Sequence, residues 1–243
     1  MGMAMFEQQA DSWPGRVFDL PELREREGVF ADRADAGRRL AELMAGFRAG
    51  EALLLAVPAG GVPVAAALAD ELELELDVAV VSKITLPWNT EAGYGAVAFD
   101  GSVRLNEPLV RRLGLSDAEV RAGIERTRRK VGKRVAELRG DRPLPRLQER
   151  TAILVDDGLA SGFTMLAAAE AVRAVGAGQV IVAVPTAHTG SIERILRAVD
   201  RVYCCNLRGG LRFAVASAYR HWYDVSLEEA RRVLEAHRSA PGG

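Results

Sequence analysis

Two adjacent aspartates, Asp156 and Asp157, follow the apolar run 153–155 and precede a loop of small and hydroxyl residues. Such an apolar run is typical of a buried strand in a parallel sheet, and ligands bind where these strands end. The loop 158–164 leads into a run with high helix propensity, and free N–H groups at a helix N-terminus attract anions. Carboxylates beside an anion-binding loop suit a ligand with hydroxyl groups next to a phosphate, such as a ribose 5-phosphate.

The loop has no lysine and lacks the Gly-x-x-x-x-Gly-Lys-Ser/Thr order of nucleoside-triphosphate-binding loops. The order Ile-Leu-Val-Asp-Asp-Gly-Leu-Ala-Ser-Gly-Phe-Thr at 153–164 resembles the phosphoribosyl-pyrophosphate (PRPP) binding signature of the type I phosphoribosyltransferases. The resemblance implies that Asp156 and Asp157 contact the ribose hydroxyls and that the loop binds the 5-phosphate. The PRPP-binding loop residues are then Gly158, Leu159, Ala160, Ser161, Gly162, Phe163 and Thr164. An ordinary strand-to-helix turn with capping acids is the alternative.

A second strand-to-helix turn has the sequence Pro58-Ala59-Gly60-Gly61. Its glycine pair permits close backbone approach to an anion, although it can also mark a simple tight turn. This turn resembles the family's pyrophosphate-binding loop, which implies a cis peptide bond between Pro58 and Ala59. Ala59 departs from the family, in which Arg or Lys is common at this position. Lys83, at the expected end of the strand 78–81, is implied to contact pyrophosphate and to act in catalysis; a solvated surface lysine is the alternative.

The segment 86–95 is predicted to be a loop, and 96–105 a hairpin that turns at Asp100 and Gly101. The resemblance implies that a mobile lid lies here and closes over PRPP to exclude water. Glu91 is the one carboxylate in this loop and is the candidate catalytic acid or base. The ordinary alternative is a solvated glutamate.

Two further residues, His188 and Phe213, are candidates for contact with a base. His188 follows the predicted strand 180–184, and Phe213 opens an aromatic-rich tail that resembles that of the 6-oxopurine members. Ala160, in contrast, resembles the residue that adenine members of the family carry at this position. The identity of the base is therefore left open. A helix-capping histidine and a core aromatic residue are the alternatives.

Strand and helix patterns alternate from residue 32 onward and predict an α/β fold with a doubly wound parallel sheet of the type I phosphoribosyltransferase kind. Residues 1–31 are expected to form a partly disordered N-terminal extension, and 32–240 a single domain. Within it we expect a helical insertion at 104–150 and a small C-terminal hood and helix at 207–240. Capping boxes open both long helices, at Ser116-Asp-Ala-Glu119 and Ser226-Leu-Glu-Glu229.

Composition narrows the possible partners. A net charge of -1 argues against a global nucleic-acid role. No apolar run approaches the length of a membrane span, and the N-terminus lacks the order of a signal peptide. We therefore expect a cytoplasmic protein without a membrane partner. Cys204 and Cys205 are the only cysteines and should face opposite sides of a strand as reduced core thiols.

The resemblance implies a transferase of nucleotide metabolism or salvage that binds PRPP, substrate-bound Mg²⁺ and a small-molecule acceptor, with most magnesium ligands coming from substrate and water. We also expect a homo-oligomer, namely a dimer. A non-catalytic PRPP sensor is the alternative, favoured by Ala59. A weaker alternative is RNA binding by the insertion, because this segment contains 14 Arg or Lys residues and 7 Asp or Glu residues. In that case, neutralising Arg128, Arg129 and Lys133 would abolish the binding of RNA.

Overall fold

The computed structural model describes residues 13–86, 88–210 and 212–239, except for the side chains of residues 90–92. Its main element is a six-stranded sheet with the strand order β1-β9-β8-β7-β2-β3. Every neighbouring pair in this sheet is parallel. The strands are β1 (Val17–Asp19), β2 (Leu53–Ala56), β3 (Glu75–Val78), β7 (Thr151–Val155), β8 (Gln179–His188) and β9 (Arg201–Arg208). All six carboxyl ends therefore lie at one edge.

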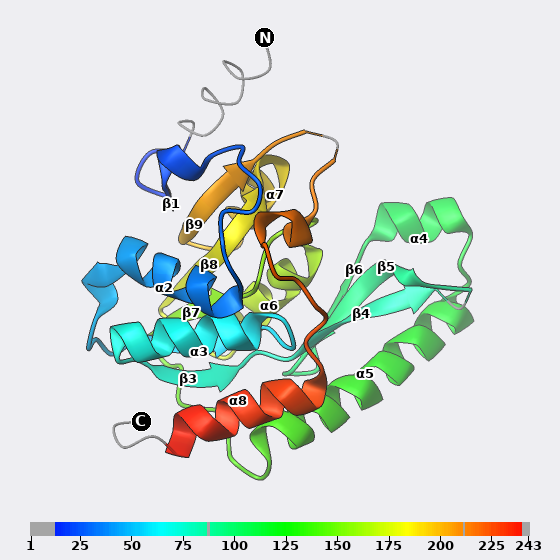
Figure 1. Cartoon of the computed structure of the whole chain (residues 1–243). Coiled ribbons are helices and arrows are strands. Elements are labelled where there is room, and N and C mark those ends of the chain that lie inside the picture. Colours follow the sequence, from blue (N-terminus) through cyan, green and yellow to red (C-terminus); the bar gives the residue numbers. More distant parts are fainter. Residues whose placement is uncertain (1–12, 87, 211, 240–243) are drawn as a thin grey trace.

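Helices cover both faces of this sheet (Figure 1). On one face lie α2 (Arg33–Leu43) and α3 (Gly61–Leu72), with α8 (Leu227–Ser239) packed against α3. On the other face lie α6 (Phe163–Ala174) and α7 (Thr189–Ile195). The alternation along β7 explains this arrangement, because Ile153 and Val155 face the first core whereas Leu154 faces the second. The predicted doubly wound α/β fold is confirmed.

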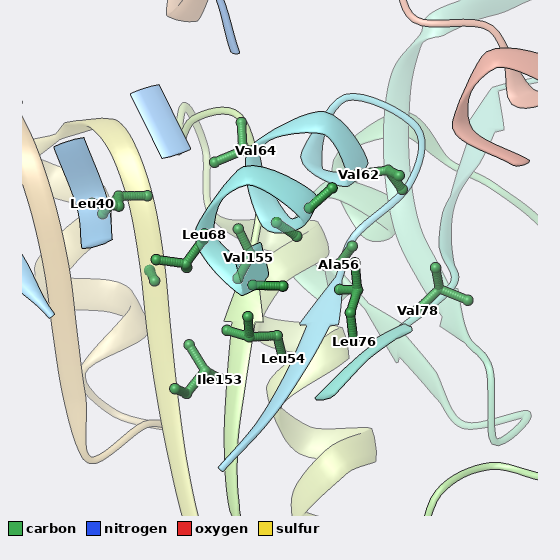
Figure 2. Close-up of a cluster of buried hydrophobic side chains, with 14 of the residues drawn as sticks. Leu40, Leu54, Ala56, Val62, Val64, Leu68, Leu76, Val78, Ile153 and Val155 are labelled. Atoms are coloured by element: carbon green, nitrogen blue, oxygen red, sulfur yellow. The ribbon is translucent and has the colours of Figure 1, made fainter. Parts of the chain in front are cut away.

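The first core is packed between α2, α3 and strands β2, β3 and β7 (Figure 2). Leu40 and Leu68 approach the sheet from the helices, and Leu54 and Ile153 meet them from the strands, all with no exposed surface. Full burial of such a side chain stabilises the fold by about 1.5 to 3 kcal/mol each. This core sets the positions from which the loops at the sheet edge start.

A second, antiparallel sheet contains β4 (Val81–Leu86), β5 (Asn89–Ala98) and β6 (Val103–Leu105). The predicted hairpin turn at Asp100 and Gly101 is confirmed, with Gly101 at a φ of 84°. The expectation that 86–95 is a loop was wrong, since most of the segment belongs to β5. The reason is tertiary: Ile84 and Tyr94 are buried against the insertion helix.

That insertion consists of α4 (Glu107–Leu113) and α5 (Asp117–Arg139). The predicted capping box is present, since the Ser116 and Glu119 side chains each bond the other's backbone N–H. The helix ends at Arg139, and Gly140 is its C-cap residue with a φ of 66°. Gly123 leaves space for Tyr94, because a side chain at this position would collide with the Tyr94 hydroxyl. Helix α5 thus supports the second sheet directly.

Residues 13–31, expected to form an extension ahead of the domain, pack onto it. Strand β1 pairs with β9, and Phe18 stacks on Tyr203 with ring centroids 4.7 Å apart. Phe30 is fully buried and contacts Tyr219. The short β1 carried too weak a pattern to be recognised. Residues 1–12 lie outside the described part of the chain.

The connecting segments include three short 3₁₀ helices: η1 (Pro21–Leu23), η2 (Ala45–Phe47) and η3 (Val215–Ala218). Cys204 and Cys205 are both free and fully buried in β9, which confirms the prediction of core thiols. Within the described ranges, no helix has both the length and the apolar character needed to cross a membrane.

Candidate active site

The two predicted ligand loops lie side by side at the carboxyl edge of the main sheet. Strands β2 and β7 are neighbours, with Ala56 opposite Val155, so the turn after β2 meets the aspartates after β7. A side chain on Gly60 would overlap the carboxylate of Asp157, and one on Gly61 would come within 2.6 Å of the Val155 carbonyl oxygen. The glycine pair is therefore required by the close approach of these two loops.

The acid pair is held by bonds from several directions. The backbone N–H of Asp157 donates to Asp156 Oδ1 at 2.8 Å. Arg33 donates to Asp157 Oδ2 from both Nε (3.0 Å) and Nη2 (2.9 Å). The Tyr219 hydroxyl donates to the Asp157 carbonyl oxygen at 2.5 Å. The orientation of Asp157 is thus fixed by residues far away in the sequence.

Burial makes this pair resist ionisation. Burial raises the pKa of Asp156 well above its ordinary value, and the charge of Asp157 raises it further. Burial also raises the pKa of Asp157, while the Arg33 guanidinium acts in the opposite direction. A ligand that donates hydroxyl hydrogens would stabilise the charged form of these acids.

The loop after the acids is exposed at Ala160 and Ser161, and the Ser161 hydroxyl accepts the N–H of Phe163 at 3.4 Å. Gly162 adopts a φ of 71° and precedes α6, whose first residues include Phe163 and Thr164. The hydroxyl of Ser191 donates to the Ala160 carbonyl, and Arg194 donates to the Ser161 carbonyl. The loop is thereby tied to α7 through its oxygens, while the first N–H groups of α6 lack intrahelical partners, as in any helix. This arrangement suits an anion.

The turn after β2 has the features that the resemblance implied. The Pro58–Ala59 peptide bond is cis. Helix α3 follows without a side-chain cap, and the N–H groups of Gly61 and Val62 donate to the carbonyl oxygens of Val57 and Ala59 within the turn, both at 3.1 Å. Ala59 supplies no positive charge, which leaves backbone groups as the donors of this turn.

Lys83 comes from a different place than expected. Strand β3 ends at Val78, and Lys83 lies within β4 of the second sheet, where it is exposed. It pairs in register with Ala96, whose side chain belongs to the core shared with α6. Lys83 therefore projects from the same face of the second sheet as Ala96, on the side where α6 lies.

His188 and Phe213 lie together, with ring centroids 5.6 Å apart. The N–H of Gly190 donates to His188 Nδ1 at 3.1 Å, so Nε2 carries the proton and donates to the Gly210 carbonyl, also at 3.1 Å. Both ring nitrogens are therefore used within the chain. His188 also stays close to the loop after β7, because its N–H donates to the Leu159 carbonyl at 2.9 Å.

Glu91 belongs to β5, but its side chain lies outside the described residues. Its role as acid or base stays a prediction.

Comparison with known proteins identifies this architecture. Residues 99–218 match the model of the phosphoribosyl transferase domain. The crystal structure of TT1426 from Thermus thermophilus is 35% identical in sequence and superposes with a TM-score of 0.67, covering 84% of this chain and 97% of that chain. The chain belongs to the type I phosphoribosyltransferase family.

Two Mycobacterium tuberculosis proteins, named "Putative phosphoribosyl transferase MT0597" and "Putative phosphoribosyl transferase Rv0571c", are each 37% identical to this chain over 211 residues. The matched region covers 86% of this chain and 47% of each relative. The chain thus spans about half the length of these curated relatives.

Four residues around the acids were not predicted from the sequence. Arg33 is only 5% exposed, and its guanidinium carbon lies 4.0 Å from the ring centroid of Trp222. Arg33 also donates to the Tyr223 carbonyl at 2.9 Å, beside Tyr219. One signal was present: an arginine in the first turn of α2 opposes the helix dipole, so it needs an acidic partner.

Proposed function

We propose that the chain binds PRPP with Mg²⁺ and transfers the 5-phosphoribosyl group to a nitrogen nucleophile, releasing pyrophosphate. The observation that supports this most is the placement of a partly buried acid pair between two helix N-termini, those of α3 and α6. A sugar with hydroxyls in the middle and a phosphate group at each end matches that order of groups.

In this proposal each part of the site has one task. Asp156 and Asp157 accept hydrogen bonds from the ribose hydroxyls, and the residues Gly158, Leu159, Ala160, Ser161, Gly162, Phe163 and Thr164 surround the 5-phosphate. The backbone of Pro58, Ala59, Gly60 and Gly61 binds pyrophosphate together with Lys83. The bond between C1 and the pyrophosphate oxygen breaks, and a bond between C1 and the acceptor nitrogen forms. Positive charge that develops on the sugar is stabilised by the nearby carboxylates.

Mg²⁺ enters the proposal as an ion carried by the substrate. The site offers carboxyl and carbonyl oxygens, which are the kind of donor that Mg²⁺ accepts. We expect phosphate oxygens and water to supply most of its ligands, and the bound ion to neutralise charge on the leaving pyrophosphate.

We propose a nucleobase as the acceptor, bound near Phe213 and His188. Because both nitrogens of His188 already have partners, this residue would shape the pocket rather than read a base edge. Glu91 is the proposed acid or base, and the β4–β5 hairpin the proposed lid.

The test is pyrophosphate release from PRPP and Mg²⁺ across a panel of nucleobases, with PRPP binding recorded in parallel by calorimetry. Asp157→Asn serves as the negative control. Release with one base would establish the transferase and name the acceptor. Absence of PRPP binding by the wild-type protein would overturn the proposal.

A PRPP sensor without catalysis is the second candidate, and Ala59 is the observation that favours it. With no cation in the turn after β2, the stabilisation of leaving pyrophosphate rests on backbone N–H groups and Lys83. Tight PRPP binding without release for any base would select the sensor.

A further inference from the structure

The proposed chemistry assigns no task to the buried charged group that contacts the acid pair. Arg33 is the first residue of α2, and its side chain is 5% exposed. Its two bonds to Asp157 both end on Oδ2, so Oδ1 lies outside the ion pair. Resting on the proposed function, we infer that Arg33 is a positioning residue that fixes the Asp157 carboxylate for a ribose hydroxyl.

The geometry restrains the arginine as tightly as the acid. Nη1 of Arg33 donates to the Tyr223 carbonyl at 2.9 Å, and the guanidinium lies 4.0 Å from the Trp222 ring centroid. An arginine fork over an aromatic ring has less freedom to lose on forming each bond than a lysine has. Trp222 and Tyr223 therefore act on the ribose site through Arg33.

Asp157 is restrained on its remaining sides. The Tyr219 hydroxyl bonds its carbonyl, and Gly60 lies directly against its carboxylate. The acid has little room for another orientation.

A purely structural ion pair explains these observations less well. A buried ion pair is often no more stabilising than apolar residues of the same volume, because both charges lose their water. The acid involved here is one of the two proposed ribose ligands.

The charged and titratable groups around Asp157 give the inference a specific signature. They are Asp156 beside it, Arg33 from α2 and Tyr219 from the C-terminal segment, while the turn after β2 contributes uncharged Gly60. Burial raises the pKa of Tyr219 well above its ordinary value, so it stays protonated. Arg33 is thus the main group that opposes the effect of burial on the pKa of Asp157, and hydrogen bonds from Asp156 and the backbone act in the same direction.

The experiment compares Arg33→Met, Arg33→Lys and Trp222→Leu with wild type. PRPP affinity is measured by calorimetry between pH 5 and pH 8, and KM and kcat are measured with the accepted base. For Arg33→Met we expect affinity for PRPP to fall about 10-fold to 100-fold and KM to rise more than kcat falls. The loss of affinity at low pH should begin at a higher pH, because protonated Asp157 cannot accept a hydroxyl hydrogen.

The other two variants separate charge from geometry. Arg33→Lys should restore the wild-type pH profile but not the full affinity, since it keeps the charge and loses the fork. Trp222→Leu, which leaves both ionic partners in place, should weaken PRPP binding several-fold. Arg39→Met is the matched control, as Arg39 lies on the same helix with a side chain 54% exposed. It should behave as wild type.

Thermal unfolding of each variant is recorded to check that it folds. If Arg33→Met does not fold, the PRPP affinities of Arg33→Lys and Trp222→Leu test the inference. Wild-type affinity and an unchanged pH profile in the folded Arg33 variants would overturn the assignment and leave the proposed function standing. Absence of PRPP binding by wild type would overturn both.

Discussion

The two halves of the loop after β7 are built in opposite ways. Asp156 and Asp157 are partly buried, and distant side chains hold Asp157 in one orientation. Ala160 and Ser161, a few residues later, are exposed, and the loop is held to α7 through its carbonyl oxygens. In the proposed function, the first half therefore binds the ribose hydroxyls through side chains, and the second half binds the phosphate through the backbone.

This difference predicts where substitutions matter. Replacing a side chain at the acid end removes the recognising group itself. A similar replacement in the phosphate loop leaves the N–H donors in place, so its effect should be small. The following predictions test that contrast.

The largest effect is expected for Asp157→Asn, which should lower PRPP affinity by at least about 100-fold, as should Asp156→Asn, because a carboxylate that accepts hydroxyl hydrogens is lost. Calorimetry with PRPP and Mg²⁺ measures this, and circular dichroism checks that the fold is intact. Asp141→Asn, in an exposed turn, is the control. Unchanged affinity in the Asp157 variant would remove the central claim.

Gly60→Ala should lower PRPP affinity about 10-fold, since the added Cβ would overlap Asp157 Oδ2 and displace the carboxylate. Gly46→Ala is the matched control, as a Cβ there would meet nothing within 4 Å. The same calorimetric titration applies. Equal affinities for the two variants would contradict the close approach of the two loops.

Thr164→Ala should lower PRPP affinity only about threefold, because the backbone donors at the start of α6 remain. A loss as large as that of Asp157→Asn would show that side chains dominate the phosphate half as well. The contrast between the halves would then fail.

The smallest effect concerns stability. The pKa of Asp156 is raised above its ordinary value, so the contribution of this group to stability should fall as pH rises from about 4 through its pKa in the folded state. Asp156→Asn removes that charge, keeps an oxygen for the Asp157 N–H and should stabilise the fold by about 1 kcal/mol at neutral pH. The midpoint of thermal unfolding should then rise by about 2 to 4 °C. The gain should shrink toward pH 4, and an equal gain at both pH values would refute this cause.

Local patterns in the sequence were enough to predict most strands of the main sheet, the capping box of α5 and both loops at the edge of that sheet. These features depend on residues close together in the chain. The ion pair between Arg33 and Asp157 joins residues 124 positions apart, and no local pattern encodes such a contact. The same reason applies to Tyr219, which bonds Asp157 across 62 positions.

Lys83 illustrates a different limit. The apolar pattern predicts that it follows a strand of the main sheet, whereas the chain changes sheets between Val78 and Val81. The apolar run is continuous across this point because both sheets are buried there. Hydrophobicity alone could not locate the change.

In the basic helix α5, neighbouring acidic residues neutralise part of the positive charge that a count of Arg and Lys residues suggests. Arg128 pairs with Glu125 at 2.7 Å, and Lys133 lies 3.6 Å from Glu137. Two of the three residues proposed to contact RNA are thus paired within the helix, which reduces the net charge offered to a polyanion. This pairing favours an ordinary solvated helical face over an RNA-binding one.

The residues that hold Asp157 also determine which segment of the chain could be transferred to another protein together with the site. The segment recognised as a phosphoribosyl transferase domain spans residues 99–218. It contains both aspartates, but Arg33 and the turn after β2 precede it, and Tyr219 and Trp222 follow it. A graft limited to the recognised segment would move the acids without the groups that orient them. The smallest exchangeable unit of this site must therefore reach from α2 to the aromatic residues ahead of α8.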